Sequence, residues 1–203
     1  MLKYSYPKET IKNVKNIIFD MDGTLVNTAK ATIPACQESA VKFGLPVKQP
    51  DEIAKMIGWA NPEFYLRLYP DFNPELIYSF AEETEIKEKR MIEEMGAEIL
   101  FPEVRELLEY LKLQGCYLAI ASTGSLEHVE TSLKVTGIYD IFDTINCGES
   151  EKGSMVKRII ERGPNGEWLI LGDKSKDSHA GRINEIITVA ARYGFGFDEE
   201  YEQ

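Results

Sequence analysis

The chain has 203 residues, of which 43% are hydrophobic and 28% are charged, and its formal net charge at pH 7 is −11. This length allows one sizeable hydrophobic core, alone or with a smaller second one. The acidic balance argues against broad binding to nucleic acid or to anionic membranes, because both partners attract clustered lysine and arginine.

Five short apolar runs are predicted to be buried strands. In chain order they are NIIF (16–19), YLAIA (117–121), FDTIN (142–146), WLIL (168–171) and IITVAA (186–191). Segments with helical periodicity lie between most of these runs. Alternating strands and helices are typical of a parallel sheet that helices cover on both faces, so the sequence predicts an α/β fold.

Two of the intervening helices have clear start and stop signals. One is expected over 102–114, where Pro102 opens the helix and Gly115 closes it. The other, over 125–136, begins with the favourable N-cap residue Ser125. The apolar face of the first helix is expected to contain Val104, Leu107, Leu108 and Leu111.

A long interval separates the first two strands. Residues 28–97 have helical patterns without a convincing strand, and the glycines and prolines among them indicate turns between helices. We therefore expect two domains: a core made of residues 1–27 and 98–203, and an inserted helical domain made of residues 28–97.

Polar residues directly follow the predicted strands. In open parallel sheets, ligands bind at this place, beyond the carboxyl ends of the strands. In chain order the polar residues are Asp20 and Asp22, Ser122 and Thr123, Lys152, and Asp173 with Asp177. Carboxylates crowded together repel one another unless a cation lies among them, and oxygen ligands of this kind suit Mg²⁺.

The other side chains at this edge suit an anion. Ser122 lies beside the amides of a helix N-terminus, which favour negative charge, and Lys152 adds a point charge. Together the residues indicate a site for a phosphoryl group beside Mg²⁺, with one aspartate available to attack phosphorus.

The motifs resemble those of a known superfamily. DMDGT (20–24), the Ser122 loop, Lys152 and GDKSKD (172–177) are similar, in order and in position after the strands, to the four signature motifs of the haloacid dehalogenase superfamily. The helical insertion resembles the C1 cap of its phosphoglycolate-phosphatase-like branch. The resemblance implies a Rossmann-like core with an inserted α-helical C1 cap.

The resemblance also implies roles for the site residues. Asp20 would be the nucleophile and form an aspartyl-phosphate, and Asp22 would be the general acid and then the general base. Mg²⁺ would be held by Asp20, the backbone carbonyl of Asp22 and Asp173, with Asp177 as a further ligand or a supporting acid. The phosphoryl oxygens would be held by Ser122, Lys152 and backbone amides near Asp22 and Thr123. Lys157, Lys174 and Lys176 are the alternatives to Lys152.

The cap offers candidates for substrate contact. The segment MIGWANPE (56–63) is similar to the cap loop that faces the active site in this branch, which makes Trp59 and Asn61 candidates for contact with the leaving group. His128 and His179 are expected to be surface residues without a catalytic role.

These expectations lead to a Mg²⁺-dependent phosphatase that acts on a small phosphorylated metabolite. One alternative is a sugar phosphate mutase of the β-phosphoglucomutase kind, which needs a cation in the cap. Asn61 or Pro62 stands where that mutase has an arginine, and Arg67 is the nearest candidate. A second alternative is a non-catalytic regulatory protein that keeps only the scaffold.

Localisation and partners are predicted from what the sequence contains. The N-terminal segment has no long apolar run, no stretch approaches about 20 apolar residues, and the three cysteines are widely spaced. We therefore expect a cytoplasmic protein with reduced thiols, a monomer or homodimer, with no nucleic-acid or membrane partner.

Overall fold

The computed structural model describes residues 11 and 13–196, so the outermost parts of the expected core segments lie outside the described residues. Within them a five-stranded sheet has the order β3-β2-β1-β4-β5, and each neighbouring pair is parallel. The strands are β1 (Asn16–Phe19), β2 (Tyr117–Ser122), β3 (Thr144–Cys147), β4 (Trp168–Gly172) and β5 (Ile187–Ala190). The α/β fold with a parallel sheet is confirmed.

Two strands begin later than the sequence indicated, β5 by one residue, at Ile187, and β3 by two. Strand β3 starts at Thr144 rather than at Phe142. The preceding Asp143 is engaged at the end of its neighbour, because its carboxylate accepts a hydrogen bond from the Leu118 amide at 2.8 Å and pairs with Lys112. Because the Asp143 side chain is hydrogen-bonded to the backbone of the neighbouring strand, Asp143 does not continue the regular strand pattern, and β3 begins after it.

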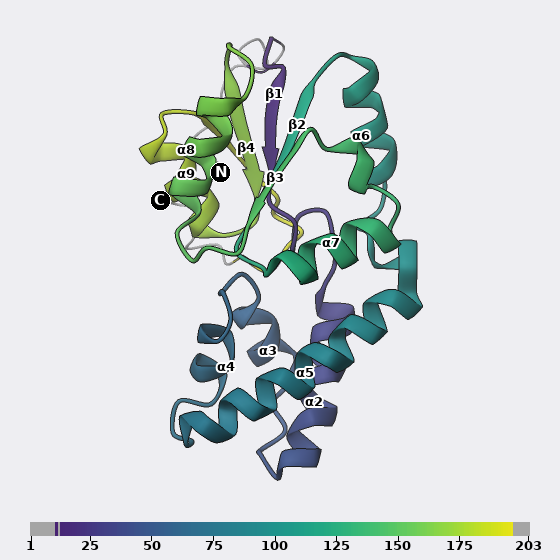
Figure 1. Ribbon diagram of the computed structural model, residues 1–203, viewed down its shortest axis with the longest axis vertical. Coiled ribbons are helices and arrows are strands. Elements are labelled where there is room, and N and C mark those ends of the chain that lie inside the picture. The colour runs from purple at the N-terminus through teal and green to yellow at the C-terminus, as the bar shows by residue number, and fades with distance from the viewer. Residues whose placement is uncertain (1–10, 12, 197–203) are drawn as a thin grey trace.

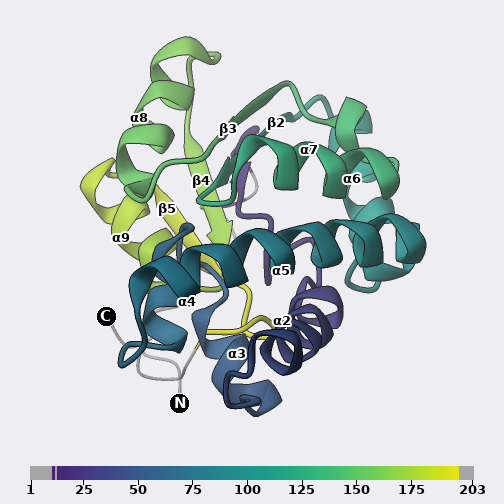
Figure 2. The same cartoon turned by 60° about the horizontal axis from the view of Figure 1, so that its bottom comes forward.

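Helices cover both faces of the sheet (Figure 2). The helices of the core are α6 (Val104–Leu113), α7 (Leu126–Val135), α8 (Lys152–Arg162) and α9 (Ser175–Ile183), with short 3₁₀ turns at η1 (Gly96–Ile99) and η2 (Tyr139–Ile141). Successive strand residues point to opposite faces. Ile17 and Phe19 therefore pack in the core that contains the α6 and α7 residues, and Ile18 packs in the core that contains those of α8 and α9.

The predicted apolar face of α6 is correct except at one position. Val104 and Leu108 are buried and Leu111 packs against them, but Leu107 is 44% exposed. The buried stripe follows the i, i+4, i+7 spacing and is narrow, so Leu107 lies at its solvent edge.

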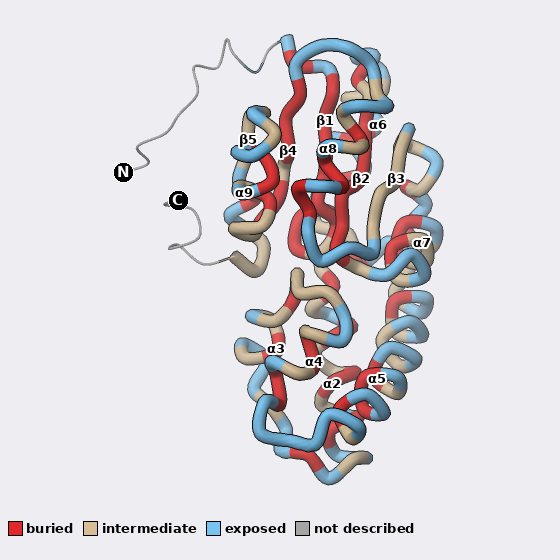
Figure 3. Tube along the Cα trace, turned by 60° about the vertical axis from the view of Figure 1, so that its left-hand side comes forward, coloured by how far each residue is buried: buried red, intermediate tan, exposed pale blue. Residues whose placement is uncertain are grey.

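The inserted segment is helical, as expected. Its helices are α2 (Ala29–Phe43), α3 (Pro50–Met56), α4 (Glu63–Leu68) and α5 (Pro74–Met95), and they lie together beyond one end of the sheet (Figure 1). They enclose a hydrophobic core of their own, in which the rings of Tyr65 and Tyr69 meet Phe80 edge-on. Figure 3 shows buried residues in both parts; most of those in the inserted helices form this core, whereas Ala31 and Ile92 pack with the residues of the sheet. This supports our proposal that residues 28–97 are a separate domain, which we call the cap.

The two connections between core and cap run side by side. The Asn27 amide donates to the Ile99 carbonyl at 2.8 Å, and the Phe101 amide donates to the Leu25 carbonyl at 3.0 Å. Val26 and Leu100 form an isolated antiparallel bridge between them. The cap is therefore held at the carboxyl end of β1, where the predicted site lies. No helix within residues 13–196 is long and apolar enough to span a membrane.

Candidate active site

The first site segment is the loop that follows β1. Asp20 is 4% exposed, and its own amide still donates to the Leu171 carbonyl of β4 at 2.8 Å. The chain then folds back, because the Gly23 amide donates to the Val26 carbonyl and the Val26 amide donates to the Met21 carbonyl. This tight loop ends the strand and separates the directions of the side chains of Asp20 and Asp22.

Lys152 is the cation of the site. It is the first residue of α8 and is 4% exposed, and its Nζ lies 2.7 Å from Asp20 Oδ1 and 2.7 Å from Asp177 Oδ1. Burial lowers the pKa of Lys152, but the Asp177 and Asp20 carboxylates raise it more, and the net result is a pKa above the usual lysine value. The alternatives Lys174 and Lys176 instead donate to backbone carbonyls.

The other carboxylates come from the end of β4 and the first turn of α9. Asp173 Oδ2 accepts from the Phe195 amide at 2.6 Å, and Asp177 Oδ2 accepts from the Lys174 amide at 3.0 Å. Asp20, Asp173 and Asp177 are all buried, and each offers an oxygen within 4.8 Å of the others. Asp173 Oδ1 is buried and has no hydrogen-bond partner among the described residues.

Burial and mutual repulsion disfavour negative charge in this cluster. Burial, followed by the charge of Asp177, raises the pKa of Asp20 well above its ordinary value, although Lys152 opposes the shift. Burial is also the main cause that raises the pKa of Asp173 to about 6, against the hydrogen bond from Phe195. The cluster thus has more buried carboxylates than Lys152 alone can neutralise.

Gly23 lets the first loop approach this cluster. Its φ is +82°, and a Cβ on it would lie 2.3 Å from Asp173 Oδ2. Gly44 is a matched control, because its φ is +66° and its Cβ would meet nothing within 4 Å. We expect Gly23→Ala to lower the free energy of unfolding by roughly 1–3 kcal/mol more than Gly44→Ala does, because both strain the backbone but only the first forces Asp173 to move. Urea unfolding in EDTA measures the difference, and equal losses would contradict the close approach.

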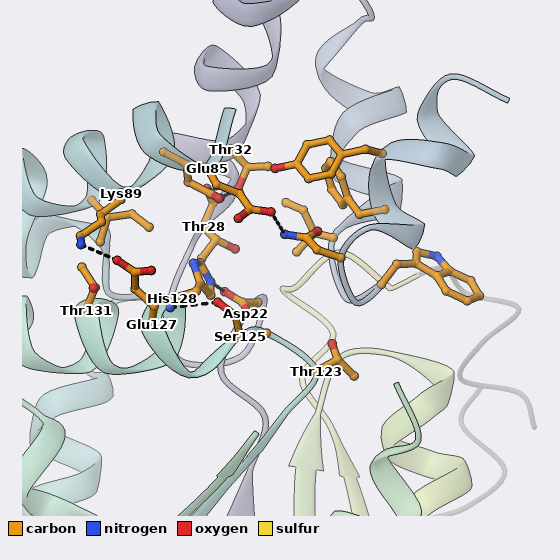
Figure 4. A pocket seen from close by; sticks show the side chains of 18 of the residues that line it. Asp22, Thr28, Thr32, Glu85, Lys89, Thr123, Ser125, Glu127, His128 and Thr131 are labelled. Atoms are coloured by element: carbon orange, nitrogen blue, oxygen red, sulfur yellow. Dashed lines mark hydrogen bonds and ion pairs between the residues drawn. The ribbon is translucent and has the colours of Figure 1, made fainter. Parts of the chain in front are cut away.

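Asp22 points away from the buried cluster and lines a cavity of about 380 Å³ between core and cap. Its Oδ1 accepts a hydrogen bond from His128 Nε2 at 2.9 Å, and the two side chains face each other in Figure 4. A Cβ at Gly124 would lie 3.3 Å from Ser122 Oγ and 3.5 Å from Asp22 Oδ2, so both oxygens approach the same point.

The expectation that His128 is a surface residue is wrong. Only 21% of its side chain is exposed, and it lies in the third position of α7, directed at Asp22. Burial lowers the pKa of His128, but the charge and hydrogen bond of Asp22 raise it further, to about 9, so the ring is protonated at neutral pH. His179 is exposed, as predicted.

The second strand supplies Ser122 and Thr123. Ser122 ends β2 and is buried, and its Oγ accepts from the Gly124 amide at 3.1 Å. The Thr123 hydroxyl donates to the Gly58 carbonyl of the cap at 3.1 Å. The Thr123 side chain therefore links the core to the cap loop.

The cap loop places Trp59 and Asn61 on the wall of the same cavity. The Trp59 ring lies between two cations, with Arg67 Cζ 3.6 Å and Lys176 Nζ 4.2 Å from its centroid. Asn61 donates to Glu85 Oε1 at 2.6 Å. Arg67, the cap cation that a mutase would need, also donates to Glu63 at 2.6 Å.

The comparisons with known proteins agree with this architecture. The model of the haloacid dehalogenase-like hydrolase family matches residues 17–191. A phosphoglycolate phosphatase of Haemophilus influenzae is 28% identical over 198 residues, which cover 91% of this chain and 88% of the relative. The pyrophosphatase PpaX of Halalkalibacterium halodurans is 22% identical, with 94% and 89% covered.

The fold is also found in solved structures. The crystal structure of a predicted phosphoglycolate phosphatase from Haemophilus somnus superposes with a TM-score of 0.82 at 22% identity, covering 91% of this chain and 88% of that one. The match to the family extends over both the core and the inserted helices. The chain therefore belongs to the haloacid dehalogenase-like hydrolase family and is an enzyme of its phosphatase group.

Proposed function

We propose that this protein is a Mg²⁺-dependent phosphatase that hydrolyses a small phosphorylated metabolite through an aspartyl-phosphate on Asp20. One observation carries the proposal: Asp20 lies in the buried cluster with Lys152, whereas Asp22, two residues later, lines the adjoining cavity. One carboxylate is thus available to the phosphorus atom and the other to the alcohol that leaves.

The reaction has two steps. A carboxylate oxygen of Asp20 attacks phosphorus, the bond from phosphorus to the substrate alcohol breaks, and the leaving oxygen takes up a proton from Asp22, which in turn receives the proton of the protonated His128 ring. Water then attacks the aspartyl-phosphate and gives a proton to Asp22, and the bond between phosphorus and Asp20 breaks to release inorganic phosphate. His128 holds Asp22 on the side of the leaving alcohol through its hydrogen bond.

The phosphoryl oxygens have candidate partners on both sides of Asp20. Lys152 contacts Asp20 Oδ1 and contributes positive charge, and Ser122 ends the neighbouring strand with its hydroxyl near Gly124. Charge neutralisation by such fixed groups is the main way in which proteins accelerate phosphoryl transfer.

The residues fit Mg²⁺. The ligands would be the carboxylates of Asp20, Asp173 and Asp177 with the backbone carbonyl of Asp22; the partnerless, buried Oδ1 of Asp173 is the observation that favours a bound cation. When bound, Mg²⁺ would neutralise the carboxylates and the charge on the phosphoryl oxygens.

The test measures hydrolysis of p-nitrophenyl phosphate and thermal unfolding, each with Mg²⁺ and with EDTA. We expect EDTA to lower the rate at least about 100-fold and added Mg²⁺ to restore it. Mg²⁺ at about 100 times its Kd should raise the melting temperature by roughly 5–10 °C, because it binds only the folded protein.

Asp173→Asn should remove both effects of Mg²⁺. The matched control is Asp140→Asn, which changes an exposed aspartate outside the cluster and should keep both. A protein that hydrolyses the ester equally well in EDTA would refute the metal requirement. A protein that binds Mg²⁺ but hydrolyses no phosphate ester would favour the non-catalytic alternative.

A further inference from the structure

The cavity beside Asp22 is strongly acidic. Along the cap side it is lined by three glutamates of helix α5, Glu82, Glu85 and Glu88, and on the core side by Asp22 and Glu127. Figure 4 shows Glu85 opposite the pair formed by His128 and Asp22. Apolar side chains complete the wall, including Ile57, Phe64 and Ile92. The leaving group of a substrate bound at Asp20 would enter this cavity.

The positive charges of the cavity are already paired. Among the described residues that line it, the cations are Lys89 and His128. Lys89 Nζ lies 2.6 Å from Glu127 Oε1, and His128 Nε2 lies 2.9 Å from Asp22 Oδ1. Each cation thus has a carboxylate partner. Glu82, Glu85 and Glu88 form no ion pair with a lining residue, and the cationic charge that reaches Glu85 and Glu88 is that of His128, which Asp22 already pairs.

The cations near the cap loop that lie outside the set of lining residues, Arg67 and Lys176 among them, already have partners. Arg67 pairs with Glu63 and stacks on Trp59. Lys176 donates to the Gly58 carbonyl and approaches Trp59 from the core side. Both are engaged at the loop that covers the cavity.

The pKa shifts of the glutamates agree with an excess of negative charge in the cavity. Burial, followed by the charge of Glu88, raises the pKa of Glu85, and burial raises the pKa of Glu88, although the charge of His128 opposes both shifts. A further anion placed between them would meet the same unfavourable potential, whereas a hydrogen-bond donor or a cation would relieve it.

The cavity also has unused hydrogen-bonding capacity. Asn61 and the Thr32 hydroxyl each donate to one glutamate, Glu85 and Glu88 respectively, and each carboxylate can accept several more hydrogen bonds. Thr28 also lines the cavity; it is 1% exposed, and its hydroxyl has no hydrogen-bond partner among the described residues. Such a buried polar group favours a ligand that supplies its missing partner.

We propose that the substrate is a phosphomonoester whose alcohol carries hydrogen-bond donors, either hydroxyl or ammonium groups, and no second anionic group. The proposal rests on the proposed phosphatase function and narrows it. It separates this chain from its relatives named for phosphoglycolate and pyrophosphate, because the carboxylate of phosphoglycolate or a second phosphate would lie among Glu85, Glu88 and Asp22 without a spare cation.

Three two-carbon esters test the proposal with one skeleton. They are 2-phosphoglycolate, 2-hydroxyethyl phosphate and 2-aminoethyl phosphate, whose free ends are anionic, neutral and cationic. We expect kcat/KM with Mg²⁺ to be roughly 10- to 100-fold lower for phosphoglycolate than for either of the others. The kcat/KM values of 2-hydroxyethyl phosphate and 2-aminoethyl phosphate then show which kind of hydrogen-bond donor the cavity prefers.

Variants of α5 connect this preference to the cavity. Glu85→Gln and Glu88→Gln should each raise the ratio of phosphoglycolate to 2-aminoethyl phosphate hydrolysis roughly fivefold or more, because each removes one negative charge near the free end. The matched control is Glu93→Gln, an exposed glutamate of the same helix outside the cavity, which should leave the ratio unchanged.

Generic phosphatase activity separates the two proposals. If p-nitrophenyl phosphate and all three esters resist hydrolysis, the phosphatase function itself fails. If p-nitrophenyl phosphate is hydrolysed but the esters are too slow to rank, their inhibition constants against it give the order instead. Hydrolysis or binding of phosphoglycolate as good as that of the other two would overturn the substrate class and leave the phosphatase function standing.

Discussion

Replacing Asp20 with asparagine should reduce turnover by at least about 10⁴-fold while leaving the fold intact. An amide oxygen cannot form the acyl phosphate that the two-step reaction requires, and loss of a nucleophile usually removes most of an enzyme's rate acceleration. The protein should keep its structure because burial already raises the pKa of Asp20, so a neutral group of the same size is well tolerated there.

The contacts around residue 20 support the same expectation. The amide oxygen can still accept from the Met21 backbone amide, which donates to Asp20 Oδ1 at 2.8 Å. Lys152 keeps its contact with Asp177. The melting temperature of Asp20→Asn should therefore lie within a few degrees of the wild-type value, as should that of the surface control Asp140→Asn.

Two measurements decide the role of Asp20. The first is kcat with a phosphate ester and Mg²⁺, which should be lost in Asp20→Asn and kept in Asp140→Asn. The second is the mass of the peptide that contains residue 20 after acid quenching during turnover, which should gain a phosphoryl group in the wild type only. Normal turnover by Asp20→Asn, or a phosphoryl group on another peptide, would show that the nucleophile is a different residue.

The sequence was sufficient to predict the sheet and the residues at its edge. Short apolar runs can be buried strands, and the carboxyl ends of parallel strands lie at one edge, so the positions of Asp20 and Asp173 follow from the chain order alone. The structure places both in one buried cluster with Lys152 nearby.

His128 could not be predicted in the same way. It lies 106 residues from its partner Asp22, and its environment depends on how the start of α7 meets the loop after β1. A histidine at the start of an amphipathic helix has no periodic signal that separates a surface position from a cavity wall. The sequence contained one indirect indication of the position of His128. The helix follows the Ser122 loop, and the strand order places that loop at the same edge of the sheet as Asp22.

The acidic cavity could not be predicted from the sequence for a related reason. Helix α5 has many glutamates, and helical periodicity predicts the helix but does not show which of them face the core domain. That choice depends on how the cap lies on the core, through the paired connections at Asn27 and Ile99 and through contacts such as Thr123 with Gly58. The packing between the two parts therefore decides which glutamates of α5 line the cavity.

Replacing Lys152 with methionine should destabilise the metal-free protein by about 3–5 kcal/mol, a loss of roughly 6–20 °C in melting temperature. The change removes the cation that lies 2.7 Å from both Asp20 Oδ1 and Asp177 Oδ1. The buried carboxylates of Asp20, Asp173 and Asp177, whose oxygens lie within 4.8 Å of one another, then repel each other without a neutralising charge. Methionine keeps the length and the apolar stem, so the expected loss comes from charge rather than from a cavity.

Mg²⁺ should rescue much of this loss, because a divalent cation among Asp20, Asp173 and Asp177 replaces the missing positive charge. The rise in melting temperature from EDTA to Mg²⁺ should thus be larger for Lys152→Met than for the wild type, while phosphatase activity stays low for lack of the lysine beside the phosphoryl group. The matched control is Lys157→Met on the same helix, where the lysine is exposed and lies 3.9 Å from Glu161. If Lys152→Met in EDTA were as stable as Lys157→Met, the carboxylate cluster would not depend on Lys152 for its neutralisation, and the electrostatic account of the site would be wrong.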